Sequence, residues 1–370
     1  MDGGGDPTPA GVLGAHGLTP RLFRLCGTRH NRPVLVRIGT AIALLVPVGA
    51  AAGTANAPSA ATPPMRIAFL VDPAGGPDYP LQRLQIQGVR RAVDQLGVEA
   101  EVVTPSPREG GTAALARFGR QGYDLVMGFD YDTSLSVADV ARRYPKTVFA
   151  ALEYSRADFE RPPPNLIGLP FRAQGIGYVV GYLAGLMERR RRGRDAVGAV
   201  GGFRLPPVLR FIAGFGAGAR RAAPGITVLT GYAESFVDPD KCRRVALGQL
   251  AKGAGTVFDV AGDCGRGTLA AARGRGRWAI GVDFDRSSLG PHVLSSAVKR
   301  YDVVVFELVR TLVRGNLRRG RDYPQTLANG AFSLGRFSPE VPQPIRERVR
   351  AVLREVAAGR VRGIPESPTP

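Results

Sequence analysis

The sequence contains few of the residues that metal sites and nucleophilic catalysis need. Its 370 residues include three cysteines and three histidines. Only Cys242, Cys264 and His292 lie beyond the first 64 residues. Two cysteines and one histidine at these separations match neither a zinc-ligand spacing nor a disulfide framework. We therefore expect no catalytic residues, no metal and no cofactor.

Lysine is also scarce, although the chain is strongly basic. The formal net charge is +19, but only four of the fifty basic residues are lysines and the rest are arginines. The arginines are spread over nearly every predicted helix. Their densest run, Arg189–Arg192, follows an apolar helix whose dipole favours cations at that end. A nucleic-acid surface would instead gather basic and aromatic residues on one face, so we expect no nucleic-acid partner.

Motifs of nucleotide-dependent enzymes are missing as well. A dinucleotide-binding fold needs a G-x-G-x-x-G turn between its first strand and first helix. The stretch GFGAGA at 214–219 has the wrong spacing and lies within a predicted helix. Asp72 lacks the neighbouring aspartates that calcium coordination in a nucleoside hydrolase would need. The sequence therefore favours a binding protein over an enzyme.

The first 64 residues have the pattern of an export signal followed by a linker. An uncharged apolar run, residues 38–53, follows four arginines between residues 24 and 37 and precedes the small-x-small sequence Ala55–Ala57. This order is typical of secretory signal peptides. The run has 16 residues and contains Pro47, whereas a membrane-spanning helix needs about 20 apolar residues. No cysteine follows it, so we expect no lipid-attachment site, and an uncleaved anchor is the alternative.

From Met65 onward, short apolar runs alternate with amphipathic helical stretches such as Gln174–Arg189. Repeated βα units with almost continuously apolar strands predict an α/β fold with parallel sheets covered on both faces. Ten strands exceed a usual single sheet, and single cores rarely grow beyond about 300 residues, so two similar lobes are expected. The expected strands are Arg66–Val71, Ala100–Val103, Leu125–Gly128, Thr147–Leu152, Leu166–Leu169, Ala196–Val200, Thr227–Leu229, Thr256–Val260, Trp278–Val282 and Val293–Val298.

Acidic residues and a glycine directly follow several of these strands. Ligands of open parallel sheets bind beyond the carboxyl ends of the strands, where such residues would meet. Each carboxylate has an alternative role as a helix N-cap, but their recurrence favours a shared cleft for a ligand with hydroxyl or N–H donors. The residues at these strand ends are Asp72, Glu153, Gly262, Asp263 and Asp283.

Several motifs along the chain, most of them in its second half, resemble one known family. The resemblance covers nearly all of residues 65–365 and is to the basic membrane protein family, whose members include bacterial purine nucleoside receptors. Its motifs here are PNLIGLPFRAQGIGYVVGYLAG (164–185), VGAVGGFRLPPVLRFIAGFGAGA (197–219), YAESFVDPDK (232–241), VAGDCGRG (260–267), WAIGVDFD (278–285), SSAVKRYD (295–302) and NGAFSLGRFSPEVP (329–342).

The resemblance implies a type I periplasmic-binding-protein fold, with two Rossmann-like lobes joined by three crossovers. It also implies an ABC-type import partner for the ligand-loaded protein. Under this reading residues 1–64 are the signal and linker. Lobe 1 is expected to comprise residues 65–170 and about 284–325, and lobe 2 residues 171–283 and about 326–365.

The resemblance also implies roles for individual residues. Phe236, in AESFVD, would form an aromatic wall for a purine, and Gly262 would let the loop backbone approach the ligand. Asp283, in GVDFD, would accept hydrogen bonds from ribose hydroxyls, and Lys299, in SAVKR, would donate to them. Asp72 and Glu153 fall where family members place contacts to the base.

The first lobe departs from the family pattern. Family members carry a stacking phenylalanine where Leu81 stands here, and Tyr79 is the ring available to replace it. The usual Gly-Gly-Thr-Gly loop is here Gly262–Gly265, which adds the carboxylate of Asp263 and places Cys264 where it could line the pocket. These departures put the purine nucleoside in doubt as the ligand, and the fold is unaffected.

Together these observations predict an exported, non-catalytic and monomeric solute-binding protein that acts outside the cytoplasm, secreted or associated with the cell surface. It would bind a purine nucleoside or similar small hydroxylated ligand and present it to the permease subunits of an ABC transporter. Two alternatives share the same cleft. One is a receptor that reports its ligand to a signalling partner, and the other is a binder of a sugar-like ligand.

The N-terminal pattern generates a test of export. A reporter fused to residues 1–57 should be carried across the membrane, because the arginines and the apolar run form a complete signal. Mass spectrometry of the secreted protein should find a new N-terminus near Pro58. Recovery of protein that retains residues 38–53 would indicate an uncleaved anchor instead.

Overall fold

The computed structural model describes residues 63–71, 79–106, 108–128, 131–193 and 195–368. The apolar run at 38–53 and the strand-end residue Asp72 lie outside these ranges. All ten expected strands are present, with small differences at their ends. Among the described helices, none is both long and apolar enough to cross a membrane.

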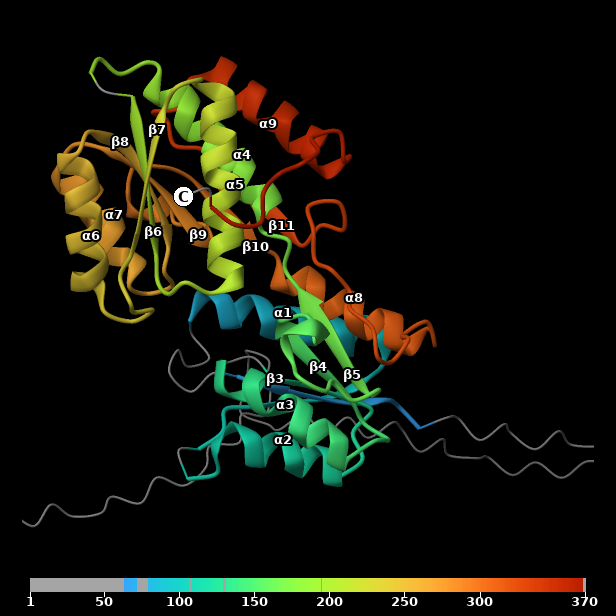
Figure 1. Ribbon diagram of the computed structural model, residues 1–370. Helices are drawn as coiled ribbons and strands as arrows, with labels where there is room; N and C mark the ends of the chain where they lie inside the picture. Colours follow the sequence, from blue (N-terminus) through green and yellow to red (C-terminus); the bar gives the residue numbers. More distant parts are fainter. Residues whose placement is uncertain (1–62, 72–78, 107, 129–130, 194, 369–370) are drawn as a thin grey trace, which may run out of the picture. The chain divides into compact units, whose positions relative to one another are not determined.

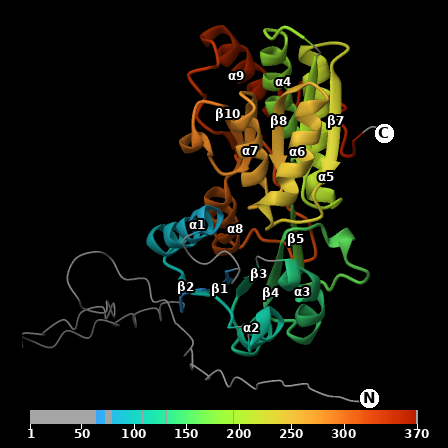
Figure 2. The same cartoon turned by 90° about the vertical axis from the view of Figure 1, so that its left-hand side faces the viewer.

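The first lobe contains a five-stranded sheet in which every strand is parallel to its neighbours, in the order β2-β1-β3-β4-β5 (Figures 1 and 2). Its elements are β1 (Arg66–Leu70), α1 (Pro80–Leu96), β2 (Glu99–Val103), α2 (Gly110–Arg120), β3 (Leu125–Gly128), α3 (Tyr131–Arg143), β4 (Val148–Glu153) and β5 (Leu166–Pro170).

Alternation along the strands explains why helices cover both faces of this sheet. On β1, Ile67 and Phe69 belong to the core cluster that includes α1, whereas Ala68 and Leu70 belong to the cluster that includes α2 and α3. All four side chains are fully buried. Successive residues of a strand point to opposite faces, so a continuously apolar strand needs cover on each side.

The second lobe contains a six-stranded sheet in the order β11-β10-β9-β8-β6-β7, parallel except for β11. Helices α4 and α5 cover one face and α6 and α7 the other (Figure 1). Its elements are α4 (Gln174–Glu188), β6 (Ala196–Gly201), α5 (Pro206–Ala222), β7 (Thr227–Tyr232), α6 (Pro239–Ala251), β8 (Ala254–Val260), α7 (Gly265–Gly274), β9 (Trp278–Asp283), β10 (Val293–Lys299), β11 (Phe332–Leu334) and α9 (Gln343–Ala357).

Glycines allow α4 and α5 to pack with their backbones in contact. A Cβ atom added at Gly181 would lie 2.0 Å from the carbonyl oxygen of Phe215, and one at Gly218 would lie 1.9 Å from that of Tyr178. No side chain fits at these distances. The stretch 214–219, which has the wrong spacing for a dinucleotide-binding turn, therefore has a packing role in α5.

The chain passes between the lobes three times, and the boundaries differ from those expected. Residues 284–325 were expected in lobe 1, but β10 pairs with β9 in the second sheet, so the chain leaves that sheet only after Lys299. Helix α8 (Tyr301–Val313) then packs against α1 in the first lobe. The returning segment forms bridges from Asp322 to Gly168 and from Gln325 to Phe171.

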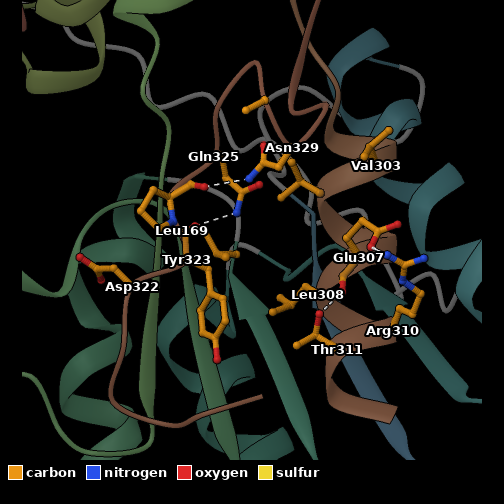
Figure 3. Close-up of a pocket in the computed structure, with 13 residues that line it drawn as sticks. Leu169, Val303, Glu307, Leu308, Arg310, Thr311, Asp322, Tyr323, Gln325 and Asn329 are labelled. Carbon is orange, nitrogen blue, oxygen red and sulfur yellow. Dashed lines mark hydrogen bonds and ion pairs between the residues drawn. The ribbon is translucent and has the colours of Figure 1, made fainter. Parts of the chain in front are cut away.

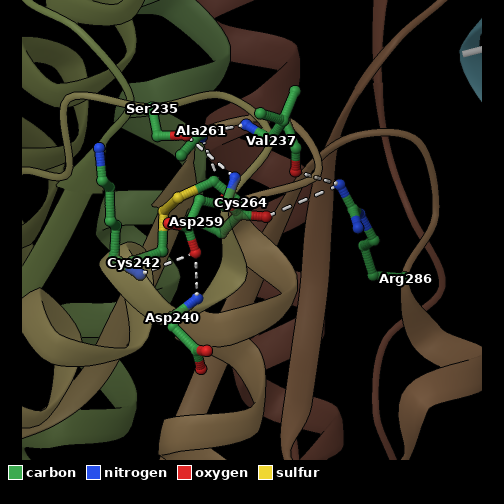
Figure 4. Close-up of a disulfide and its surroundings, with 11 residues drawn as sticks. Ser235, Val237, Asp240, Cys242, Asp259, Ala261, Cys264 and Arg286 are labelled. Carbon is green, nitrogen blue, oxygen red and sulfur yellow. Dashed lines mark hydrogen bonds and ion pairs between the residues drawn. A yellow bond between two sulfur atoms is a disulfide. The ribbon is translucent and has the colours of Figure 1, made fainter. Parts of the chain in front are cut away.

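A disulfide links α6 to the loop before α7, contrary to the sequence-based expectation for these two cysteines. Cys242 and Cys264 are joined with their Cα atoms 5.6 Å apart, and both are fully buried (Figure 4). Spacing alone could not show this pairing, because the two cysteines are 22 positions apart in the sequence and a complete β-strand lies between them. Cys264 is thus a disulfide-bonded residue of the core, and the expectation that its side chain could line the ligand pocket is wrong.

We expect the disulfide to stabilise the second lobe. Closing a loop of this length restricts the unfolded chain, which typically contributes about 2–4 kcal/mol. The double variant Cys242→Ser/Cys264→Ser should therefore melt at a lower temperature than the oxidised protein in differential scanning calorimetry. Reduced wild-type protein is the control and should match the variant; equal melting temperatures before and after reduction would contradict the assignment.

Candidate functional site

A buried lysine joins the two lobes at the carboxyl ends of their sheets. Lys299 ends β10 and is 8% exposed. Its Nζ lies 2.7 Å from Oε1 of Glu153, at the end of β4 in the first lobe, and 3.3 Å from Oδ1 of Asp283, at the end of β9 in the second. The structure thus brings together two of the strand-end candidates, Glu153 and Asp283, and Lys299, which the family resemblance added.

Aromatic rings surround this ion cluster. The ammonium nitrogen lies 5.5 Å from the ring centroids of Phe171 and Phe211 and 5.9 Å from that of Tyr301. Burial acts to lower the pKa of Lys299, but Glu153 and Asp283 raise that pKa above its ordinary value, so the lysine stays charged. Burial and Glu153 raise the pKa of Tyr301, whose hydroxyl donates a hydrogen bond to Glu153.

Both carboxylates sit on unusual backbone. Glu153 has φ 74° and Asp283 has φ 68°, in the left-handed region that side chains other than glycine seldom adopt. Such conformations persist where surrounding contacts hold them, and they gather at ligand sites. Here the contacts that hold them include the bonds to Lys299.

Tyr79 of the first lobe contacts Phe284 and interacts electrostatically with Asp283. Tyr79 precedes α1, and its ring meets that of Phe284 edge-on with 6.0 Å between centroids. Burial raises the pKa of the Tyr79 hydroxyl, with Asp283 the next cause, so the hydroxyl remains a donor. The ring proposed from the sequence as a replacement aromatic thus lies beside the ion cluster.

Phe236 and Gly262 face each other across two loops of the second lobe. The Phe236 ring lies over Gly202, where an added Cβ would come within 2.3 Å of it, and meets Phe203 edge-on at 5.1 Å. Gly262 has φ 58°. A Cβ atom added at Gly262 would lie 3.3 Å from the carbonyl oxygen of Phe236. The Phe236 side chain is partly buried.

Below this loop lies a second, more deeply buried ion pair. Asp259 is fully buried on β8, and Arg286 is 3% exposed after β9, with Nη2 and Oδ2 3.8 Å apart (Figure 4). Burial raises the pKa of Asp259 to about 7, against the lowering effect of Arg286 and with a further rise from Asp283. Asp263 on the same loop adds to this rise.

The remaining candidates from the sequence are placed differently. Leu81 lies on α1, partly buried against the main core, and Asp263 is half-buried on the loop next to Gly262. Sequence reasoning missed Tyr301, Phe171 and Arg286. Tyr301 and Arg286 stand within two or three residues of recognised motif residues, which was the available signal. Among the described residues, no group of three or more potential ligands could hold a metal ion.

A separate cavity lies between α8 and the returning segment. It has a volume of about 560 Å³, and Leu169, Leu308 and Tyr323 are among the residues that line it (Figure 3). Polar side chains at its rim bond within the cavity wall, as Gln325 does to the carbonyl oxygen of Tyr323. It shares no lining residue with the Lys299 cluster and is not part of the candidate site.

Comparison with known proteins gives one family and several relatives. The family described as ABC transporter substrate-binding protein PnrA-like matches residues 66–357. A CD4+ T-cell-stimulating antigen of Listeria monocytogenes is 27% identical over 266 residues, covering 67% of this chain and 72% of the relative. An ABC transporter nucleoside-binding protein, BmpA, of Lactococcus lactis is 25% identical over 260 residues, covering 65% of this chain and 71% of the relative.

The fold is also found among solved structures. The crystal structure of an ABC transporter solute-binding protein from Aeropyrum pernix K1 matches with a TM-score of 0.67 at 23% identity, covering 82% of this chain and 94% of that chain. This likeness confirms the periplasmic-binding-protein architecture of two α/β lobes.

The raised pKa of Asp259 predicts that acidity stabilises the fold. Because the folded protein holds the Asp259 proton up to about pH 7 and the unfolded chain releases it near pH 4, the free energy of unfolding should fall as pH rises between these values. The variant Asp259→Asn lacks this dependence and should be the more stable protein at pH 8, by up to about 4 kcal/mol. Chemical denaturation at pH 5 and pH 8 measures both; parallel pH profiles would contradict the prediction.

Proposed function

Because the chain belongs to the family of ABC transporter substrate-binding proteins described as PnrA-like, we propose that it binds a purine nucleoside or a similar small hydroxylated ligand between its lobes. The observation that carries the proposal is the cluster of Lys299, Glu153 and Asp283, which draws on the strand ends of both sheets. The loaded protein would then be recognised by the permease of an ABC transporter.

The ion cluster suits a vicinal diol. The Asp283 carboxylate can accept hydrogen bonds from two neighbouring hydroxyls, and charge-assisted bonds of this kind are roughly twice as strong as neutral ones. Lys299 can donate to the same hydroxyl oxygens. Its ammonium lies closer to Glu153, at 2.7 Å, than to Asp283, at 3.3 Å, so Asp283 is the more weakly bound partner. Ribose carries such a diol, and so do many sugars.

The aromatic side chains favour a planar base beside the diol. Phe236 offers a partly buried ring in the second lobe, and Tyr79 and Phe284 offer two more next to Asp283. Stacking a base on one ring contributes about 1–3 kcal/mol. The Lactococcus lactis relative is named as a nucleoside-binding protein, which supports the same ligand class.

The proposal includes a non-catalytic, monomeric protein that acts outside the cytoplasm. The cluster holds a lysine whose raised pKa keeps it protonated, which suits a hydrogen-bond donor and not a base. The disulfide between Cys242 and Cys264 supports an oxidising compartment, because such bonds are rare in the reducing cytosol. This agrees with the export signal proposed for the N-terminus.

A sensing receptor with the same ligand is the second candidate. The same two lobes would close on the ligand in either case, and only the protein that reads the closed state differs. Binding experiments therefore test the ligand class, whereas uptake of labelled ligand in cells with and without the gene tests transport.

A titration with a matched pair of variants tests the site. Guanosine, inosine and adenosine should raise the melting temperature of the mature protein, since ligand at 100 times its Kd stabilises the fold by about 2.7 kcal/mol. Asp283→Ala should weaken nucleoside binding at least about thirtyfold, because it removes a charged partner of the diol and leaves Lys299 with one carboxylate fewer. Isothermal titration calorimetry measures both affinities.

Asp285→Ala is the control for this experiment. Asp285 lies two residues further along, where it pairs with Arg336 and accepts a bond from the Ser287 backbone. Its removal should leave the affinity within about twofold. No melting shift with any nucleoside, free base or sugar would reject the ligand class, and chemical conversion of a ligand would reject the non-catalytic role.

A further inference from the structure

The loop that carries Gly262 and Asp263 is held from three directions. The backbone N–H of Ala261 donates to Oδ1 of Asp259 at 3.0 Å, and the carbonyl of Gly262 accepts from Nη2 of Arg286 at 3.1 Å. The N–H of Cys264 donates to the Phe236 carbonyl at 3.0 Å, next to the disulfide. Two of the three restraints come from the buried pair Asp259–Arg286.

Arg286 also restrains the neighbouring strand end. Its guanidinium lies 4.0 Å from the centroid of the Phe284 ring, which in turn meets Tyr79. Its backbone N–H donates to Oγ of Ser296 at 3.0 Å on β10. One arginine thus connects the loop after β8 with the segment after β9, and both segments carry side chains of the candidate site.

Neighbouring glycines make room for this pair. A Cβ at Gly265 would lie 1.7 Å from Oδ1 of Asp259, so the first residue of α7 must be glycine for the carboxylate to sit there. A Cβ at Gly281 on β9 would lie 2.4 Å from Cγ of Arg286. Both side chains therefore occupy space that adjacent positions leave free.

The ion pair Asp259–Arg286 contributes little to the stability of the fold. Oδ2 of Asp259 and Nε of Arg286 are buried without a hydrogen-bond partner among the described residues. Burying two charges costs free energy that a contact of 3.8 Å with so few hydrogen bonds does not offset. Its place between the two ligand loops therefore suggests a role in binding.

We propose that Asp259 and Arg286 are positioning residues, which orient the loop Ala261–Cys264 and the ring of Phe284 and so determine ligand affinity without touching the ligand. The inference rests on the proposed function, whose site contains Gly262 and Asp283. The inference adds the buried pair to that site. It gives the pair the role of fixing the loop after β8 and the segment after β9.

The pair also makes binding depend on pH. The titratable and charged groups that interact with Asp259 are Arg286, Asp283, Asp263 and Tyr79. Below about pH 7 the Asp259 carboxyl becomes protonated, so its attraction for Arg286 is lost, and the guanidinium keeps its contacts with Gly262 and Phe284. Ligand affinity should therefore be lower at pH 5.5 than at pH 8.

Two amide variants test the proposal, one at Asp259 near the end of β8 and one at Glu188 of α4, close to the start of β8. Asp259→Asn should weaken guanosine binding about tenfold or more at pH 8, where it is expected to raise the melting temperature, and should remove the pH dependence of the Kd. The control Glu188→Gln alters the other buried pair, whose Glu188 Oε1 lies 2.6 Å from Arg191 Nη2 near the start of β8. It should leave the Kd within about twofold.

Arg286 variants and a ligand-free measurement complete the test. Arg286→Gln should match Asp259→Asn, and the double variant should lose little more, because the two residues act as one unit. Arg286→Lys, which keeps the charge, should recover part of the affinity and serves if the glutamine variant fails to fold. Unchanged affinity in Asp259→Asn, or equal losses in Glu188→Gln, would overturn the proposal.

Hydrogen–deuterium exchange separates this proposal from the proposed function. In the ligand-free protein, Asp259→Asn should speed amide exchange at residues 261–264 and 284, and Glu188→Gln should not. If the wild type binds no nucleoside, the proposed ligand is wrong, yet faster exchange would still support the positioning role. Unchanged exchange at these amides would reject it even if nucleosides bind.

Discussion

The contact of Lys299 with two carboxylates is the interaction on which the site depends. Its ammonium group is nearly enclosed, so each of its carboxylate partners offsets the cost of removing a charge from water. One partner belongs to each lobe. The relative orientation of the two lobes is therefore coupled to the charge of the Lys299 side chain. The left-handed backbone of Glu153 and Asp283 is tolerated because these bonds hold it.

Strand β8 belongs to the core and also supports the loops of the proposed site. Its seven residues are all buried, and a buried ion pair lies at each end. At its start Glu188 and Arg191 tie it to α4, and at its end Asp259 and Arg286 tie it to the loops. The disulfide adds a covalent connection from the same loop to α6, so this part of the proposed site is held by both ion pairing and a covalent bond.

Much of the fold followed from the sequence, whereas only part of the site did. Strand periodicity is a local signal, and it located all ten parallel strands, as well as strand ends that carry Glu153 and Asp283. Partners such as Phe171 and Phe211 gave no local signal, because their rings reach Lys299 from other elements. Pairing of Cys242 with Cys264 depends likewise on the packing of α6 beside α7. The lobe boundary was wrong near residue 284 because the pattern alone does not show which sheet takes β10.

The three connections between the lobes differ in the contacts that hold them. Two of them run side by side, since the segment at 322–325 hydrogen-bonds with Gly168, Pro170 and Arg172. A pair of bonded segments resists shear but permits bending, so a rotation axis would lie along them. The third connection, at Lys299–Tyr301, carries the buried charge and packs against the first through the rings of Tyr301 and Phe171, whose centroids lie 5.1 Å apart. Relative rotation of the lobes would therefore stretch or shorten the distance from Glu153 to Lys299, so that a single ion pair reports the angle between the two lobes.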